Sequence, residues 1–251
     1  MSCPQQSEAK QALLTVLAEH HGDAKAAPVQ QAIARLVELS DSSAPAYAPE
    51  LPGCWQLVSA PNFPDGQQTA AGAWQYTLGR LAFNMFQPQT LSVQLTQVWQ
   101  DIQPLAAEHH YTHNIVVHFQ TVRPGLPTVH GIVRNLGVCQ PADDTALQVQ
   151  FTGGVLEPAP ETDMSAWQQV FQSVVPASIS WRDRLQRLVL KLIFGLGAPQ
   201  AIDPQTGRAE FPMPRSPKGR LNILYLDDTL RIMQSQKEQT WMVCERVATD
   251  Q

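Results

Sequence analysis

Charged residues are scarce in this sequence, and basic residues are the minority among them. Asp, Glu, Lys and Arg make up 16% of the 251 residues, and the formal net charge at pH 7 is −5. A protein that binds nucleic acid needs a basic surface that neutralises phosphate groups. The composition therefore argues against that class of protein, and we expect no nucleic-acid partner.

Cysteines are few and widely spaced. The four of them, Cys3, Cys54, Cys139 and Cys244, form no Cys-x-x-Cys pair, which argues against a zinc site and against a disulfide scaffold. We expect free thiols in a reducing compartment. One pairing stays open, because Cys54 and Cys244 could approach each other if the first and last strands of the fold are neighbours.

Long apolar runs are also missing. No uncharged stretch of about 20 apolar residues could cross a bilayer as a helix. Residues 1–8 lack the basic start and the following apolar run of a secretory signal peptide. We expect a protein of the cytoplasm or of a stroma-like compartment.

Motifs of catalysis are absent as well. The sequence has no Gly-x-Ser-x-Gly elbow, and its Gly153-Gly154 pair lacks the strand-to-helix context of a nucleotide loop. We therefore expect no enzymatic activity and no required cofactor.

One histidine cluster, at residues 108–113, invites a metal hypothesis. If a strand begins here, His109, Tyr111 and His113 point inward near one rim of the fold. Two imidazoles could share an ion, but further ligands would have to come from elsewhere, so we predict no metal. A polar rim that contacts the head group of a ligand and ordinary rim histidines both stay open.

What the sequence does contain is a series of strands. Four runs alternate apolar and polar residues and are separated by Pro, Gly or Asp, at residues 91–100, 114–120, 128–138 and 147–155. No helical pattern lies between them, which indicates antiparallel β structure. With a strand at 53–59 and three near the C-terminus, the sequence predicts a mainly β fold, a barrel of about eight strands.

Helices are expected before the barrel. Apolar residues recur at helical spacing twice within residues 7–40, which predicts a helical hairpin. We expect it to pack on the barrel as a cap, with a docking surface for a partner as the alternative. The predicted division is therefore a hairpin at 1–48 and a barrel at 49–251, with an insertion at 157–220.

The insertion contains the most amphipathic stretch of the chain, residues 181–196. On a helix its apolar residues form one stripe and its basic residues lie on the far side. Such a helix could close one end of the barrel or lie on a membrane surface. The expected membrane contacts are Trp181, Leu185, Arg187, Leu188, Lys191 and Leu192.

The C-terminal strands surround an Asp-Asp pair. Apolar residues alternate before and after Asp227 and Asp228, and short carboxylates suit a tight turn, so we predict a hairpin there. Asp227 lies four residues before Arg231. We predict an ion pair between the two that closes the hairpin, with a role in orienting a ligand as the alternative.

These residues also carry a family resemblance. The runs Tyr225-Leu226-Asp227-Asp228, Leu230-Arg231-Ile232 and Trp241-Met242-Val243, together with Gly53-Cys54-Trp55, resemble the plastid lipid-associated protein family, or fibrillins, of the cyanobacterial type. Gly53, Trp55, Tyr225, Asp227 and Arg231 are the signature positions. In lipocalin-like barrels such a tryptophan closes one end beneath a cationic side chain.

The resemblance implies a lipocalin-like barrel that binds or carries a carotenoid, a quinone or another lipid. It also implies peripheral association with thylakoid membranes or lipid bodies, and roles in photoprotection and stress. The residues expected to contact the ligand are Trp55, Leu95, Trp99, His113, Ile115, Phe119, Phe151, Tyr225 and Arg231.

Two other functions stay open. The same side chains could fill the barrel, leaving a docking or assembly factor for a photosynthetic membrane complex. Bilin lyases use a related barrel, but no cysteine- or histidine-centred motif in the sequence supports that activity.

Overall fold

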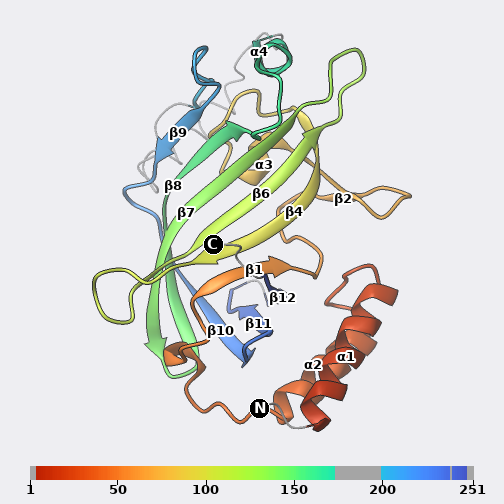
Figure 1. Cartoon of the computed structure of the whole chain (residues 1–251), viewed down its shortest axis with the longest axis vertical. Helices are drawn as coiled ribbons and strands as arrows, with labels where there is room; N and C mark the ends of the chain where they lie inside the picture. Colours follow the sequence, from red (N-terminus) through yellow and green to blue (C-terminus); the bar gives the residue numbers. More distant parts are fainter. Residues whose placement is uncertain (1–3, 173–198, 238, 248–251) are drawn as a thin grey trace.

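A computed structural model describes residues 4–172, 199–237 and 239–247. Within these residues, twelve strands form one antiparallel sheet, and eight of them close into a ring because β1 pairs with both β12 and β4. The predicted barrel of about eight strands is confirmed (Figure 1). The ring consists of β1 (Gly53–Leu57), β4 (Ser92–Ile102), β6 (Asn114–Thr121), β7 (His130–Asp143), β8 (Ala146–Pro158), β10 (Lys218–Leu226), β11 (Leu230–Ser235) and β12 (Trp241–Val247).

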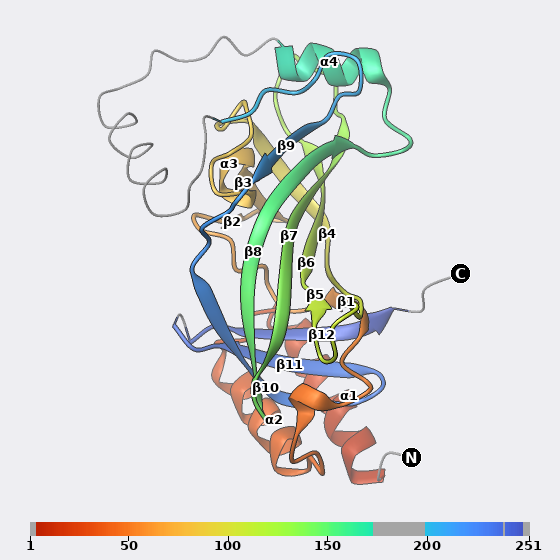
Figure 2. The ribbon, with the colours of Figure 1, turned by 90° about the vertical axis from the view of Figure 1, so that its left-hand side faces the viewer.

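Shorter elements extend the ring at its edges. β3 (Trp74–Thr77) pairs with β4 and leads into the short helix α3 (Leu78–Leu81), and β2 (Gln67–Gln68) pairs with β3. β5 (Tyr111–Thr112) pairs with β7, and β9 (Ala209–Pro212) pairs with β8. Figure 2 shows the long strands β7 and β8 arching from one end of the molecule to the other.

The predicted N-terminal hairpin is present as α1 (Pro4–Glu19) and α2 (Ala27–Glu38). It covers the outer face of β10, β11 and β12 and does not cap an end of the barrel (Figure 1). Both helices bury an apolar stripe there, and each fully buried Leu or Ile contributes about 1.5–3 kcal/mol. The shared cluster includes Leu13, Leu17, Val29, Ile33 and Leu36 of the hairpin and Tyr225, Leu230, Ile232 and Val243 of the barrel.

A helix that the sequence analysis missed, α4 (Met164–Gln172), lies across the upper end of the barrel in Figure 2. Asp163 precedes it, and the Asp163 carboxylate accepts a hydrogen bond from the Ser165 amide at 2.9 Å, which satisfies a donor of the first turn. Trp167 is fully buried and packs on Phe171 and Phe119. The predicted helix at 181–196 lies outside the described residues. None of the helices that are described is long and apolar enough to cross a membrane.

The lower end is closed around Trp55, as expected from the resemblance. Two guanidinium groups lie over its ring, with 4.7 Å from Arg231 Cζ and 4.2 Å from Arg246 Cζ to the ring centroid. Arg246 also donates to the Pro52 carbonyl at 2.8 Å. Gly53 adopts a φ of 141°, and a side chain there would collide with the Arg246 guanidinium. The 3₁₀ helix η1 (Pro45–Tyr47) packs beneath this end.

The first and last strands are neighbours, but the pairing of Cys54 with Cys244 does not form. In the β1–β12 register Cys54 lies opposite Val247, and Cys244 lies opposite Leu57. Both thiols are free.

Two β-bulges change which side chains face inward. In β4 the register shifts between Leu95 and Gln97, and in β10 it shifts between Ile223 and Tyr225. A bulge adds one residue to one strand, so the alternation of faces changes phase beyond it. The expectation that Trp99 and Tyr225 line the interior is wrong for this reason.

Both aromatic side chains pack outside the barrel instead. The Trp99 ring lies 4.7 Å from the His118 ring on the outer face. Tyr225 packs under the N-terminal hairpin, and its hydroxyl donates to Asp227 at 2.6 Å.

Candidate functional site

The barrel interior holds a cavity of about 490 Å³ between two filled regions. Above it lies an apolar core that includes α3, α4 and Phe119, and below it lies a second core around Trp55. The wall between the cores is largely apolar and includes Phe83, Ile115, Val149, Phe151, Leu221 and Met242. The sequence left a filled and a hollow interior open, and the described residues leave this part of the interior hollow.

The cavity lies where the strand β8 changes partners. β10 pairs with β8 from Asn222 to Lys218, opposite Ala146 to Gln150, and β9 pairs with β8 only from Gly153 onward. The lining includes Ser216, which lies between these two pairings, and Lys218 at the end of the first. Lys218 and Lys237 are exposed, so the cavity opens to solvent beside two lysines.

A buried guanidinium lies at the floor of the cavity. Arg231 has no exposed surface, and its Nη2 donates to Gln100 Oε1 at 2.5 Å. Its Nε and Nη1 have no hydrogen-bond partner among the described residues. Burial lowers the pKa of Arg231, with the nearby thiols of Cys244 and Cys139 acting in the opposite direction. The arrangement leaves a desolvated positive charge that bonds to the Gln100 amide and the Cys244 thiol but to none of the described carboxylates.

His113 lines the cavity and is within electrostatic range of this charge. Only 2% of its surface is exposed, and neither ring nitrogen has a hydrogen-bond partner in the part of the chain described. Burial, and then the positive charge of Arg231, lower the pKa of His113 to about 4. The ring is therefore neutral at pH 7 and presents one N–H donor and one acceptor nitrogen.

The predicted Asp227–Arg231 ion pair is wrong. The Asp227 carboxylate accepts from Lys10 Nζ at 2.8 Å, from the Tyr225 hydroxyl, and from the amides of Thr229 and Leu230. These bonds to the backbone form the expected turn. Arg231 instead points into the barrel, because its position on β11 alternates with Leu230 and Ile232, which face the hairpin.

The sequence-predicted ligand contacts are divided among four places. His113, Ile115 and Phe151 line the cavity. Trp55 and Arg231 lie below its floor, and Leu95 and Phe119 belong to the upper core. Trp99 and Tyr225 are outside, as described above.

Several residues that line the cavity escaped the sequence analysis. Gln100 was expected on the polar outer face, and only the bulge in β4 turns it inward. Phe83 lies in a stretch with no clear period, next to α3, and Met242 and Leu221 come from the closing strands. Val149 lies on the predicted apolar face of its strand, so its period-two pattern was a usable signal.

The histidine cluster separates in space. His113 is inside the barrel, but His110 is exposed and His109 is half-buried against Tyr47 and does not line the cavity, so the expectation that His109 points inward is wrong. The His109 ring lies 5.1 Å from the Tyr47 ring, and its backbone has a left-handed φ of 54° that ends the alternation. In the described ranges, no group of three or more His, Cys, Asp or Glu side chains could hold a metal ion.

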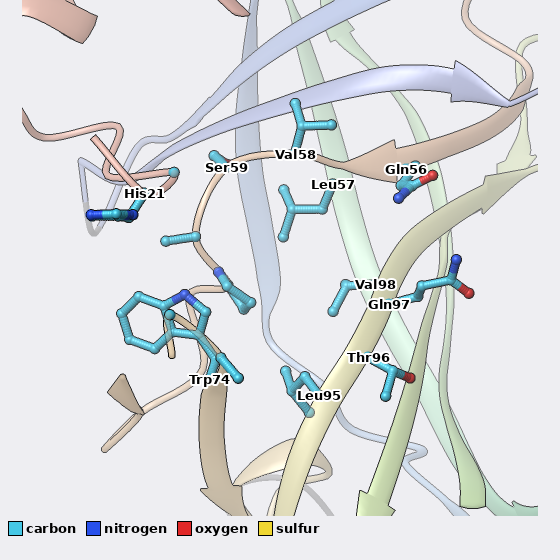
Figure 3. A pocket seen from close by; sticks show the side chains of 15 residues that line it. His21, Gln56, Leu57, Val58, Ser59, Trp74, Leu95, Thr96, Gln97 and Val98 are labelled. Atoms are coloured by element: carbon cyan, nitrogen blue, oxygen red, sulfur yellow. The ribbon is translucent and has the colours of Figure 1, made fainter. Parts of the chain in front are cut away.

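A second hollow, of about 280 Å³, lies between the hairpin and the barrel (Figure 3). β1 pairs with β4 as far as Gln56 opposite Trp99, and β3 pairs with β4 only from Gln75 opposite Gln94. The gap between the two pairings exposes the bulged part of β4. Gln56, Thr96 and Gln97 place polar groups at this groove (Figure 3), so it suits an apolar ligand less well than the interior cavity.

Comparison with known proteins gives one match. The PAP_fibrillin family model matches residues 7–244. No curated protein and no solved structure matched the chain significantly. The match spans the hairpin, the barrel strands and most of β12, and with the fold and signature residues described above it shows that this chain belongs to the PAP_fibrillin family.

Proposed function

We propose that this protein binds or carries a hydrophobic small molecule in the interior cavity and that it is not an enzyme. Membership of the PAP_fibrillin family supports a lipid-associated function. The observation that carries the proposal is the cavity of about 490 Å³ inside the barrel, walled by Ile115, Phe151 and Met242 among others.

The physical driving force is removal of apolar surface from water, worth roughly 25 cal/mol per Å². Small-molecule sites typically have volumes of about 300–1,000 Å³ with a few placed polar groups. The cavity lies in the lower half of that range, and Gln100 and His113 supply the polar groups. A ligand with a single ring or chain fits such a space more readily than a whole carotenoid, part of which would project through the mouth.

Among the ligands expected from the sequence, single-chain lipids and quinones therefore fit the size of this space better than carotenoids do. We also propose that loading takes place at a photosynthetic membrane or lipid body, where such molecules are dissolved. The exposed lysines Lys218 and Lys237 beside the mouth support this location, because basic side chains are attracted to anionic lipid surfaces.

The alternative, a docking or assembly factor with a filled barrel, has less support. Filled cores occupy the two ends of the interior, but the residues that the structure describes leave a cavity between them. The apolar stripes of the N-terminal helices are already used against the barrel wall, so they offer a partner complex little apolar surface.

The test is to fill the cavity. Ile115→Trp adds bulk at the wall, and Val138→Trp adds the same bulk at an exposed position of β7. We expect the first variant to weaken binding of an apolar fluorescent probe such as N-phenyl-1-naphthylamine by about tenfold or more, which is about 1.4 kcal/mol. The second should bind as the wild type does. Equal binding by both variants would place the ligand elsewhere and overturn the proposal.

A further inference from the structure

We infer that the polar floor of the cavity is a site for an ionised carboxylate, so that the ligand is an amphiphile with a carboxylate head and an apolar tail. This inference rests on the proposed function and names the chemical class of the molecule that the cavity takes. It is carried by the side chains of Arg231, His113 and Gln100.

Arg231 carries a positive charge inside the protein, away from solvent. A guanidinium stays protonated in proteins, and this one has no exposed surface. It hydrogen-bonds to the neutral Gln100 amide and to the Cys244 thiol, and no described Asp or Glu carboxylate bonds to it. An ion removed from water is unfavourable by several kcal/mol unless it is paired. The site therefore lacks an anion, and a ligand is the means by which one can arrive.

The floor of the cavity presents polar groups to a ligand. Gln100 and His113 line the cavity itself, and Arg231 lies behind them, bonded to Gln100 and close enough to affect His113 electrostatically. Both ring nitrogens of His113 are buried and have no partner among the described residues. A carboxylate placed here can accept a hydrogen bond from the imidazole N–H and lie in the field of the guanidinium.

Basic residues line the entrance of the cavity. The cavity lining includes Lys218 and Lys237, as well as Arg220, whose charge is paired with Asp143, whereas the described residues that line it include no Asp or Glu. This local excess of positive charge occurs in a chain whose formal net charge is −5. A cleft lined with charges of one sign attracts ligands of the opposite sign, so an anionic head is favoured from the mouth to the floor.

A neutral head, such as a quinone carbonyl or a hydroxyl, would satisfy a donor at the floor but would leave the Arg231 charge uncompensated. The two kinds of head are therefore separable by experiment. Laurate, dodecanol and methyl laurate have the same chain and differ only in the head. Their dissociation constants can be measured with the purified full chain by displacement of a fluorescent apolar probe at about pH 8, where laurate is ionised.

We expect laurate to bind about tenfold more tightly than dodecanol or methyl laurate. Equal affinities for the three would overturn the carboxylate inference while leaving the proposed apolar site standing. Failure of all three to displace the probe, together with a probe signal that Ile115→Trp does not change, would overturn the proposed function and the inference with it.

The variant that tests the site without removing Arg231 is Gln100→Glu. It places a carboxylate where Oε1 now accepts from Nη2, so the guanidinium gains an anion from the protein itself. We expect the melting temperature to rise and the preference for laurate over dodecanol to fall by about tenfold. Gln97→Glu adds the same charge at an exposed position of the same strand and should leave the preference unchanged. A preference that survives in Gln100→Glu would refute the proposed head-group site.

Discussion

Lys10 in helix α1 and Asp227 in the turn between β10 and β11 form an ion pair, with 2.8 Å between Nζ and Oδ2. The two residues are 217 positions apart in the sequence. Both side chains are mostly buried, with 15% and 18% of their surfaces exposed. The contact fixes the N-terminal hairpin on the outer wall of the barrel, next to the shared cluster that contains Tyr225.

Loss of this pair should loosen the hairpin. Partly buried charge-assisted hydrogen bonds contribute about 1.5–3 kcal/mol, so we expect Lys10→Met to lower the free energy of unfolding by about that amount. Urea denaturation at neutral pH measures it. Lys25→Met removes a lysine from the loop between the two helices, where it forms none of the ion pairs described, and should change stability by less than about 0.5 kcal/mol.

The same pair predicts a loss of stability in acid. Burial raises the pKa of Asp227, but the hydrogen bonds from Lys10, Tyr225 and the backbone outweigh it and lower the pKa to about 2. Because the unfolded state then binds the proton more readily, the stabilisation is complete above about pH 4 and is lost as the pH falls toward 2. Asp227→Asn should remove about 2 kcal/mol of this pH dependence, measured by urea denaturation across that range. An unchanged acid profile would contradict the assignment.

His113 should make the protein less stable in mild acid. Its pKa is lowered to about 4 by burial and by Arg231, so the unfolded state takes up a proton below about pH 6.5 while the folded state does not. Stability should therefore fall by about 3 kcal/mol between pH 6.5 and pH 4. His113→Phe removes the titrating group and should flatten this part of the profile. His110→Phe, at an exposed position, is the control that should leave it intact.

A side chain at Gly53 should destabilise the protein. Its φ is 141°, and a Cβ would collide with the Arg246 guanidinium that lies over Trp55. We expect Gly53→Ala to lower stability by about 3 kcal/mol through strain and the displaced arginine. Gly125 has a φ of 79° but open space around it, so Gly125→Ala reports the backbone penalty alone, about 1 kcal/mol. Thermal melts of the two variants separate the collision from the strain, and equal shifts would contradict the structural role of Arg246.

The amphipathic stretch at 181–196 remains a sequence prediction, since it lies outside the described residues. If it rests on a membrane surface, Leu188→Asp should reduce co-sedimentation with anionic liposomes by about tenfold, because a charge replaces a buried apolar contact. Gln186→Asp makes the same charge change on the opposite face of the predicted helix and should have a smaller effect. Membrane binding that Leu188→Asp leaves unchanged would refute the interfacial helix.

Local patterns were enough to predict most of the barrel. Period-two alternation identified most of the ring strands, the Gly53-Cys54-Trp55 motif indicated the first, and Asp227 indicated the turn that its carboxylate now stabilises through the Thr229 and Leu230 amides. These features depend on residues close in sequence, where side-chain direction follows directly from backbone geometry. The same reasoning placed His113, Ile115 and Phe151 in the interior correctly.

Which side chains meet at the cavity depends on how distant strands pair, and local sequence patterns do not show this pairing. The bulges in β4 and β10 turn Gln100 inward and turn Trp99 and Tyr225 outward, and each results from pairing with a strand elsewhere in the chain. The sequence by itself determined which segments become strands and that their apolar faces converge. Only the tertiary structure decided that Arg231 is buried without a carboxylate partner among the described residues, because burial and charge compensation depend on what the other strands bring beside it.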